Sequence, residues 1–205
     1  MKILVFSDIH SDLKRLERLL NIEADAYFCA GDLVSWARGL SDAGHILARR
    51  AASMYVLPGN HESTGDIARL CGNFGLTNFH GQSVTLAGVT IAGLGYSAPT
   101  PFNTPGEYTE AQMAAELAKL PPAQVLICHS PPKDTLLDRA GEGEHFGSTA
   151  VRDHIARTRP SHFFCGHIHE AEGVEERWGA TLGVNVGKRG YLLDLATLQA
   201  PSASR

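Results

Sequence analysis

Short apolar runs separated by helix-compatible segments dominate the pattern of hydrophobic and polar positions along this chain. Five runs of strand length are rich in β-forming residues: 2–7, 26–30, 54–57, 125–128 and 162–165. Between the first two, the leucines of segment 11–20 recur at helical spacing behind Ser11 or Asp12, which are common helix caps. Further helices are expected at 41–50, 64–71, 109–120 and 148–158. This alternation predicts β-α-β units with parallel strands.

The middle and the end of the chain depart from that rhythm. Segments 83–86 and 89–94 predict a hairpin, and an irregular connection containing Pro99, Pro101 and Pro105 follows it. Segments 181–186 and 191–195 again have the sequence character of strands, and residues 187–190 join them. We therefore expect mixed sheets in a single domain spanning residues 1–205, with 196–205 forming a frayed tail.

Composition restricts the range of partners. Eighteen Lys and Arg residues oppose 22 Asp and Glu residues, giving a formal net charge of −4 without any basic run, so nucleic acid is an unlikely partner. The apolar runs are too short to cross a membrane and the first residues do not resemble a signal peptide, so we expect a cytoplasmic protein. The four cysteines form no C-x-x-C pair, which argues against a disulfide framework or a thiolate zinc site. Nothing in the sequence specifies an oligomeric state.

Each of the five predicted β-α strands is followed at once by side chains that bind metals. In chain order these are Asp8, His10, Asp32, Asn60, His129, His167 and His169. If the strands are parallel neighbours, their carboxyl ends lie at one edge and the seven donors converge there. Nitrogen and oxygen donors without thiolate suit manganese, iron, nickel or zinc.

Seven donors are too many for one closed tetrahedral ion and suit two ions that share a carboxylate. Gly31, Gly59 and Gly166 stand directly before predicted ligands, where the lack of a Cβ permits a sharp turn and a close approach. Competing chemistry fits less well. The dinucleotide-like segment 93–98 runs into prolines where a helix should begin, the Gly-Lys at 187–188 lacks P-loop spacing, and no G-x-S-x-G motif occurs.

Taken together, the blocks Asp8-x-His10, Gly31-Asp32, Gly59-Asn60-His61-Glu62, His129 and Gly166-His167-x-His169 resemble the calcineurin-like metallophosphoesterases, in particular their small single-domain prokaryotic members. The resemblance covers about residues 1–170. It implies a four-layer α/β/β/α sandwich in which helices flank two mixed sheets.

The same resemblance implies a role for each residue of the site. The ligands of one metal would be Asp8, His10, Asp32 and His169, and those of the other Asp32, Asn60, His129 and His167. His61 would face the phosphate as a general acid, and manganese is the favoured metal. The implied activity is hydrolysis of small-molecule phosphodiesters or phosphomonoesters by a metal-bridging hydroxide.

Three residues are weaker candidates for contacts with substrate. They are Asn60, Arg38, which lies six positions after Asp32, and His145, which lies in the glycine-rich segment 141–148. For Arg38 the alternative is a solvated surface side chain. The segment after Asp32 lacks the Asp-Arg pair of the phosphoprotein phosphatases, which weakens an assignment of this chain as a protein phosphatase.

Two other functions stay open at this point. The chain could be a metal-binding scaffold for protein interaction, like the retromer component of this fold, although that protein has lost the catalytic histidine and His61 is present here. It could also be a phosphatase restricted to a nucleotide or sugar phosphate.

Overall fold

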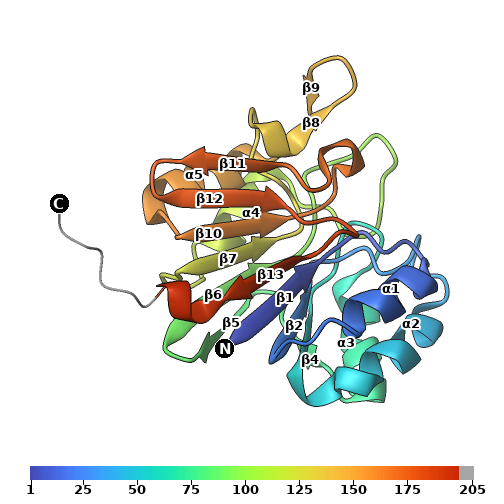
Figure 1. The fold of residues 1–205 in the computed structure, drawn as a ribbon. Helices are drawn as coiled ribbons and strands as arrows, with labels where there is room; N and C mark the ends of the chain where they lie inside the picture. The colour runs from blue at the N-terminus through green and yellow to red at the C-terminus, as the bar shows by residue number, and fades with distance from the viewer. Residues whose placement is uncertain (199–205) are drawn as a thin grey trace.

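The computed structural model describes residues 1–198, which build two large mixed sheets. Sheet A has the order β13-β1-β2-β3-β4, and its strands are β1 (Lys2–Phe6), β2 (Ala26–Cys29), β3 (Met54–Val56), β4 (Thr77–Asn78) and β13 (Tyr191–Asp194). Sheet B has the order β11-β12-β10-β7-β6-β5, with β5 (Gln82–Leu86), β6 (Val89–Leu94), β7 (Val125–Cys128), β10 (His162–Cys165), β11 (Glu175–Trp178) and β12 (Thr181–Asn185). A short hairpin of β8 (Arg139–Ala140) and β9 (Glu144–His145) projects from the body of the molecule (Figure 1).

Parallel strands form the middle of both sheets, and antiparallel strands lie at edges. In sheet A, β1 to β4 are parallel and β13 is antiparallel to β1. In sheet B, β6, β7, β10 and β12 are parallel, while β5 and β11 are antiparallel. The five predicted β-α strands are therefore divided, three in sheet A and two in sheet B. Their donors can meet only where the carboxyl ends of both sheets face the same end of the molecule (Figure 1).

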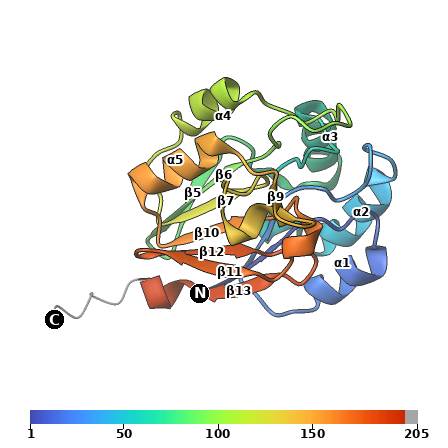
Figure 2. The same cartoon turned by 90° about the horizontal axis from the view of Figure 1, so that it is seen from above.

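Helices cover the outer face of each sheet (Figures 1 and 2). The first three, α1 (Leu13–Leu20), α2 (Leu40–Leu47) and α3 (Thr64–Phe74), pack on sheet A, whereas α4 (Glu110–Leu117) and α5 (Thr149–Thr158) pack on sheet B. Side-chain caps fix the first residues of several helices. Asp12 accepts a hydrogen bond from the Arg15 amide at the start of α1, and Ser63 forms a reciprocal capping box with Asp66 at the start of α3. The α/β/β/α sandwich implied by the family resemblance is confirmed.

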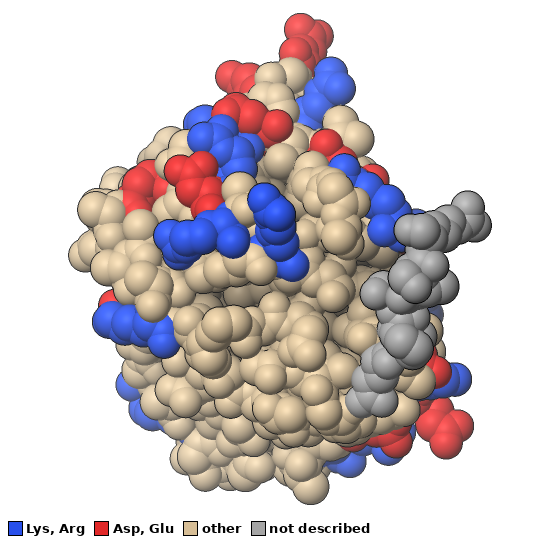
Figure 3. Space-filling view, turned by 90° about the vertical axis from the view of Figure 1, so that its left-hand side faces the viewer, with Lys and Arg blue, Asp and Glu red and all other residues tan. Residues whose placement is uncertain are grey.

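Charged side chains are unevenly distributed over the surface. Figure 3 looks onto the end of the molecule where the parallel strands begin, and Lys and Arg lie there beside Asp and Glu in the upper part, above a broad uncharged area. In residues 1–198 no helix is both long enough and apolar enough to span a bilayer.

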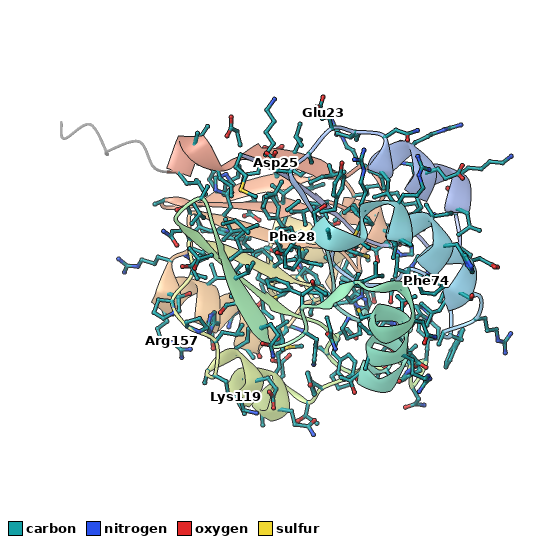
Figure 4. The ribbon with its side chains drawn as sticks, turned by 90° about the horizontal axis from the view of Figure 1, so that it is seen from below. Glu23, Asp25, Phe28, Phe74, Lys119 and Arg157 are labelled. Carbon is teal, nitrogen blue, oxygen red and sulfur yellow. The ribbon has the colours of Figure 1, made fainter. Side chains whose placement is uncertain are left out.

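Three apolar clusters hold the four layers together. One lies between sheet A and its helices, a second lies between the two sheets, and a third joins sheet B to α4 and α5. Phe28, in the second cluster, lies at the centre of the molecule (Figure 4) and stacks on Tyr55 with ring centroids 4.6 Å apart. The four cysteines are buried and free, as the sequence indicates.

Some elements differ from the expectation. The two-residue strand β4, the Glu-rich edge strand β11 and the β8–β9 hairpin were not predicted. Residues 196–198 are not frayed, because Leu195–Leu198 form a short 3₁₀ helix in which the Thr197 hydroxyl donates to the Asp194 carbonyl. The rest of the predicted tail, 199–205, lies outside the described residues. Further 3₁₀ turns occur at Ala48–Ser53, Leu136–Asp138 and His169–Ala171.

Candidate metal centre

The seven predicted donors meet at the carboxyl ends of β1, β2, β3, β7 and β10, and the backbone turns sharply to present them. Four of the seven, Asp8, His10, Asp32 and His167, have φ between +46° and +71°. The left-handed region costs a residue with a Cβ about 1–3 kcal/mol, and such strain concentrates at functional sites. The local fold therefore tolerates strain at the positions that the sequence singles out for chemistry.

Two of the glycines noted in the sequence make room for the carboxylates themselves. A Cβ on Gly59 would lie 2.0 Å from Asp32 Oδ1, and one on Gly166 would lie 2.1 Å from Asp8 Oδ2. Gly31 combines a φ of +99° with a hypothetical Cβ only 2.4 Å from the Gly59 nitrogen. The glycines thus let loops from different strands pack directly against the two aspartates.

The first group of donors consists of Asp8, His10 and His169. Nε2 of His10 lies 3.0 Å from Nε2 of His169, and Asp8 Oδ1 lies 3.9 Å and 3.7 Å from these two nitrogens. Since a divalent ion holds nitrogen and oxygen at about 2.0–2.2 Å, neighbouring ligand atoms lie about 3.0–3.5 Å apart. The observed separations are close to that range, so one cation fits among the three atoms.

A second group consists of Asp32, Asn60, His129 and His167. Asp32 Oδ2 lies 3.4 Å from His129 Nε2, and Asn60 Oδ1 lies 3.0 Å from both His129 Nε2 and His167 Nδ1. The same oxygen of Asp32 lies 3.6 Å from His10 Nε2. Asp32 Oδ2 is therefore the atom at which the two groups of donors adjoin.

For His129 and His10, hydrogen bonds fix which ring nitrogen faces the centre. Nδ1 of His129 donates to the Ala30 carbonyl at 2.8 Å, and Nδ1 of His10 lies 3.2 Å from the Ser35 hydroxyl. With the far nitrogen occupied, Nε2 of each ring is the one available for a metal.

The buried aspartates create a negative centre that histidines alone oppose. Asp8 and Asp32 are each 2% exposed, and in the described part of the chain all their ion pairs are with histidines. Burial raises the pKa of Asp32, but the His129 charge and its hydrogen bond outweigh burial and lower that pKa. Burial lowers the pKa of His129, yet Asp32 and Asp8 raise it to about 9. The centre therefore favours positive charge, which protons or metal ions can supply.

The pKa of His167 shifts downward, in contrast to that of His129. Burial lowers the pKa of the His167 ring to about 4, and the charge on His129 acts in the same direction. A neutral imidazole with a free lone pair is the form that binds a metal, so His167 is already in that form.

His61 lies beside the centre, with its ring centroid 5.2 Å from that of His10. Its backbone N–H donates to Asp32 Oδ1 at 3.0 Å, and its Nδ1 accepts from the Trp36 amide at 3.3 Å. Because Nδ1 accepts, the proton of the neutral ring lies on Nε2 and is available to donate. A ring nitrogen of His61 also lies within 4.8 Å of the donor atoms of His10 and Asp32.

Glu62 is fully buried and organises the loops behind the donors. Its carboxylate accepts from the amides of Asp32, Val34 and Gly59 at 3.0–3.1 Å. Burial raises the pKa of Glu62 to about 8 and the nearby Asp32 charge adds to this, while the N–H donors act in the opposite direction. Glu62 thus joins the loops after β2 and β3, which agrees with a supporting role for this side chain.

A cleft of about 400 Å³ opens over the centre. Its walls include His10, Asp32, Asn60, His61, His167 and His169. The other substrate candidates lie elsewhere: Arg38 is exposed in the turn after Ser35, and Nδ1 of His145 contacts the buried Asp138 at 2.7 Å and faces a neighbouring hollow. Neither Arg38 nor His145 lines this cleft, and their contacts with substrate stay predictions.

Sequence reasoning missed other residues around the cleft. Phe102 and Phe146 line it, and Thr104 accepts a hydrogen bond from Asn60 Nδ2 at 3.2 Å. None of them lies in a motif, and the only signal near Phe102 is the cluster of prolines around it.

Comparison with known proteins agrees with this arrangement. The model of the family described as calcineurin-like phosphoesterase matches residues 1–171. An uncharacterized protein of Methanocaldococcus jannaschii is 31% identical over 202 residues, which cover 94% of this chain and 91% of that protein.

Solved structures share the fold at lower identity. The structure of TT1561 from Thermus thermophilus superposes with a TM-score of 0.74 at 21% identity, over 96% of this chain and 95% of the other. Phosphopantetheinyl hydrolase from Mycobacterium tuberculosis gives a TM-score of 0.66 at 17% identity, over 91% and 88% of the two chains. With the family match across most of its length, the chain belongs to the calcineurin-like phosphoesterases, a family of metal-dependent phosphoester hydrolases.

Proposed function

We propose that the protein is a two-metal phosphoesterase that hydrolyses phosphodiesters or phosphomonoesters of small molecules. The observation that carries this proposal is the position of Asp32 Oδ2, which lies 3.6 Å from a nitrogen of the first group of donors and 3.4 Å from one of the second. The separations of the donor atoms are close to those expected within a coordination shell, which supports two divalent cations. In addition, within residues 1–198 the ion pairs of the buried carboxylates are with histidines alone.

Under this proposal Asp8, His10 and His169 hold one ion, Asn60, His129 and His167 hold the other, and Asp32 contributes to both. Manganese is the favoured metal, with iron, nickel and zinc as alternatives for the same donors. Ions bound there would lower the pKa of a coordinated water, which would supply the nucleophile, and would offset the charge of the phosphate oxygens.

The chain itself supplies the acid. His61 borders the cleft, and the amide of Trp36 holds its Nδ1 so that the proton on Nε2 is the one presented to a leaving oxygen. General-acid catalysis of this kind contributes about 10²- to 10⁴-fold. Asn60 borders the same cleft, and Thr104 accepts a hydrogen bond from its amide, which supports a role for Asn60 both in holding the ion and in contacting a phosphate.

The test uses leaving groups that differ in their need for a proton. Bis-p-nitrophenyl phosphate and p-nitrophenyl phosphate, assayed with Mn²⁺, report basic turnover and the ratio of diester to monoester activity. His61→Ala should lower kcat for an alkyl phosphate ester far more than for the p-nitrophenyl esters, because p-nitrophenolate is a weak base that leaves unprotonated. His45→Ala, which removes an exposed histidine on α2, is the matched control.

Two results would replace this proposal. If the protein binds two ions per chain but turns over neither ester, and is thus as inactive as His61→Ala, it is a metal-binding scaffold for another protein. A monoester rate far above the diester rate instead identifies a phosphatase restricted to monoesters such as nucleotide or sugar phosphates.

A further inference from the structure

Three aromatic side chains remain in contact with water at one place, the mouth of the candidate centre. Trp36, Phe102 and Phe146 are 47%, 72% and 47% exposed, and among the described residues they are the only exposed large aromatic side chains. Phe102 and Phe146 line the cleft, and the Trp36 ring lies edge-on to His61 with centroids 5.7 Å apart. Single exposed apolar side chains are common, but aromatic groups gathered at a catalytic cleft indicate a contact with a ligand.

The walls around these two phenylalanines are apolar. Beyond the donors and His61, the apolar lining consists of Pro99, Pro101, Phe102, Ala140, Phe146 and Ile168. The remaining lining residues are Thr100 and the exposed Glu170, and no Lys or Arg occurs among the described residues that line the cleft. Lys and Arg do lie on the end of the molecule where the parallel strands begin (Figure 3), in contrast to the cleft.

A hydrogen-bonded loop holds Phe102 in place. The Phe102 amide donates to the Thr100 hydroxyl, which donates to Glu107 Oε1 at 2.6 Å. The same Glu107 oxygen accepts from the amide and the hydroxyl of Thr104, and Thr104 in turn accepts from Asn60. The ring is therefore exposed on a loop that is tied to a residue of the centre.

Phe146 is held by a separate anchor. Asp138 is fully buried, its carbonyl accepts from the Phe146 amide at 3.2 Å and its Oδ2 accepts from the Gly147 amide at 2.9 Å. His145 contacts Oδ1 of the same carboxylate at 2.7 Å. Both phenylalanines are thus presented by braced backbones that have little further conformational entropy to lose when a ligand binds.

Resting on the function proposed above, we propose that Phe102 and Phe146 hold a flat aromatic ring on the alcohol portion of the substrate. The substrate class is then phosphomonoesters or phosphodiesters that carry a single phosphate on an alcohol with an aromatic ring, nucleosides included. An exposed phenylalanine stacks on aryl groups and nucleobases alike. Without Lys or Arg along the walls, a second phosphate or a further acidic group on the substrate gains nothing from the cleft and faces Glu170.

Binding of phosphonates, which cannot be hydrolysed, separates this proposal from turnover. Calorimetry with the Mn²⁺-loaded protein should give a Kd for benzylphosphonate about five-fold or more below that of ethylphosphonate, with cyclohexylmethylphosphonate between them. The phosphonate analogue of adenosine monophosphate, in which a methylene group replaces the ester oxygen, should bind at least as tightly as the corresponding analogue of adenosine diphosphate. Phe102→Ala and Phe146→Ala should each reduce the preference for benzyl over ethyl to below about two-fold. The control Leu192→Ala, which changes an exposed apolar residue on β13 outside the cleft, should keep that preference.

The failures of the two proposals are distinguishable. Equal Kd values for benzylphosphonate and ethylphosphonate, or a preference that survives both phenylalanine substitutions, overturn the aromatic contact even if the enzyme turns over p-nitrophenyl esters. Cyclohexylmethylphosphonate binding as tightly as benzylphosphonate overturns the requirement for a flat ring. Retained benzyl preference without any turnover contradicts only the proposed function.

Discussion

Replacing Gly59 by alanine changes one methyl group at the centre and should disrupt the site. The added Cβ would lie 2.0 Å from Asp32 Oδ1 and 2.5 Å from the Asp32 amide nitrogen, whereas real Cβ atoms essentially never come closer than 3.0 Å. Relief requires about 1 Å of movement at Oδ1 and about 0.5 Å at the backbone. Metal–ligand distances tolerate about 0.2 Å, so the carboxylate that we propose to serve both ions would leave its position.

The energetic consequence follows from the same contact. Overpacking a filled region costs about 1–3 kcal/mol, and for a chain of this size 1 kcal/mol corresponds to about 2–4 °C in Tm. We therefore expect Gly59→Ala to lower the Tm of the metal-free protein by about 2–12 °C and to leave fewer than one Mn²⁺ per chain after desalting. Thermal unfolding in EDTA and elemental analysis are the two measurements.

Gly72→Ala is the matched control for this substitution. Gly72 lies within α3, and a Cβ there would meet nothing within 4 Å. Alanine at an open helical position is favoured over glycine by about 0.5–1 kcal/mol, so its Tm should rise slightly and its metal content should be normal. A Gly59→Ala protein with wild-type Tm and full metal content would refute the steric argument.

Three further predictions concern the surroundings of the centre. Thr104→Val removes the acceptor that orients the Asn60 amide and should weaken Mn²⁺ binding about 10- to 100-fold in a calorimetric titration, while Thr104→Ser should preserve it; equal affinities would contradict the orienting role. Chelation by EDTA should lower Tm by about 5–10 °C, since ligand at 100 times its Kd stabilises a folded site by about 2.7 kcal/mol, and an unchanged melting curve would argue against a folded metal site. Arg38→Ala should alter kcat/KM by less than about two-fold, and a loss above ten-fold would restore Arg38 as a phosphate contact.

The positions of the donors followed from the sequence because each lies directly after a strand. Asp8 and Asp32 directly follow runs that are clearly apolar. The position of a side chain at the end of a strand depends on that strand and not on distant loops. The role of Gly59 was also predictable in kind, although only the structure shows that the group it approaches is the Asp32 carboxylate.

The division of the strands between two sheets was not readable from the β-α rhythm, because either arrangement gives parallel neighbours. The pairing depends instead on long-range contacts, such as that of β6 with β7. The family resemblance, rather than the periodicity, supplied the two-sheet architecture. Strands β4 and β11 were missed because one has two residues and the other is rich in charged residues.

Side chains on irregular segments were the least predictable. In the segment 141–148, His145 attracted attention as a titratable residue, but Asp138 holds its ring in the neighbouring hollow while Phe146 lines the cleft. Successive side chains of an extended chain point to opposite sides, so a shift of one residue reverses which of the two side chains faces the cleft. No pattern in the sequence of a glycine-rich loop fixes that choice.

Anomalous diffraction from crystals soaked in Mn²⁺ tests the central claim most directly. We predict two peaks about 3.5–4 Å apart, one beside Asp8, His10 and His169 and the other beside Asn60, His129 and His167, with Asp32 bonded to both. A single peak, or two peaks of which only one contacts Asp32, would contradict the account.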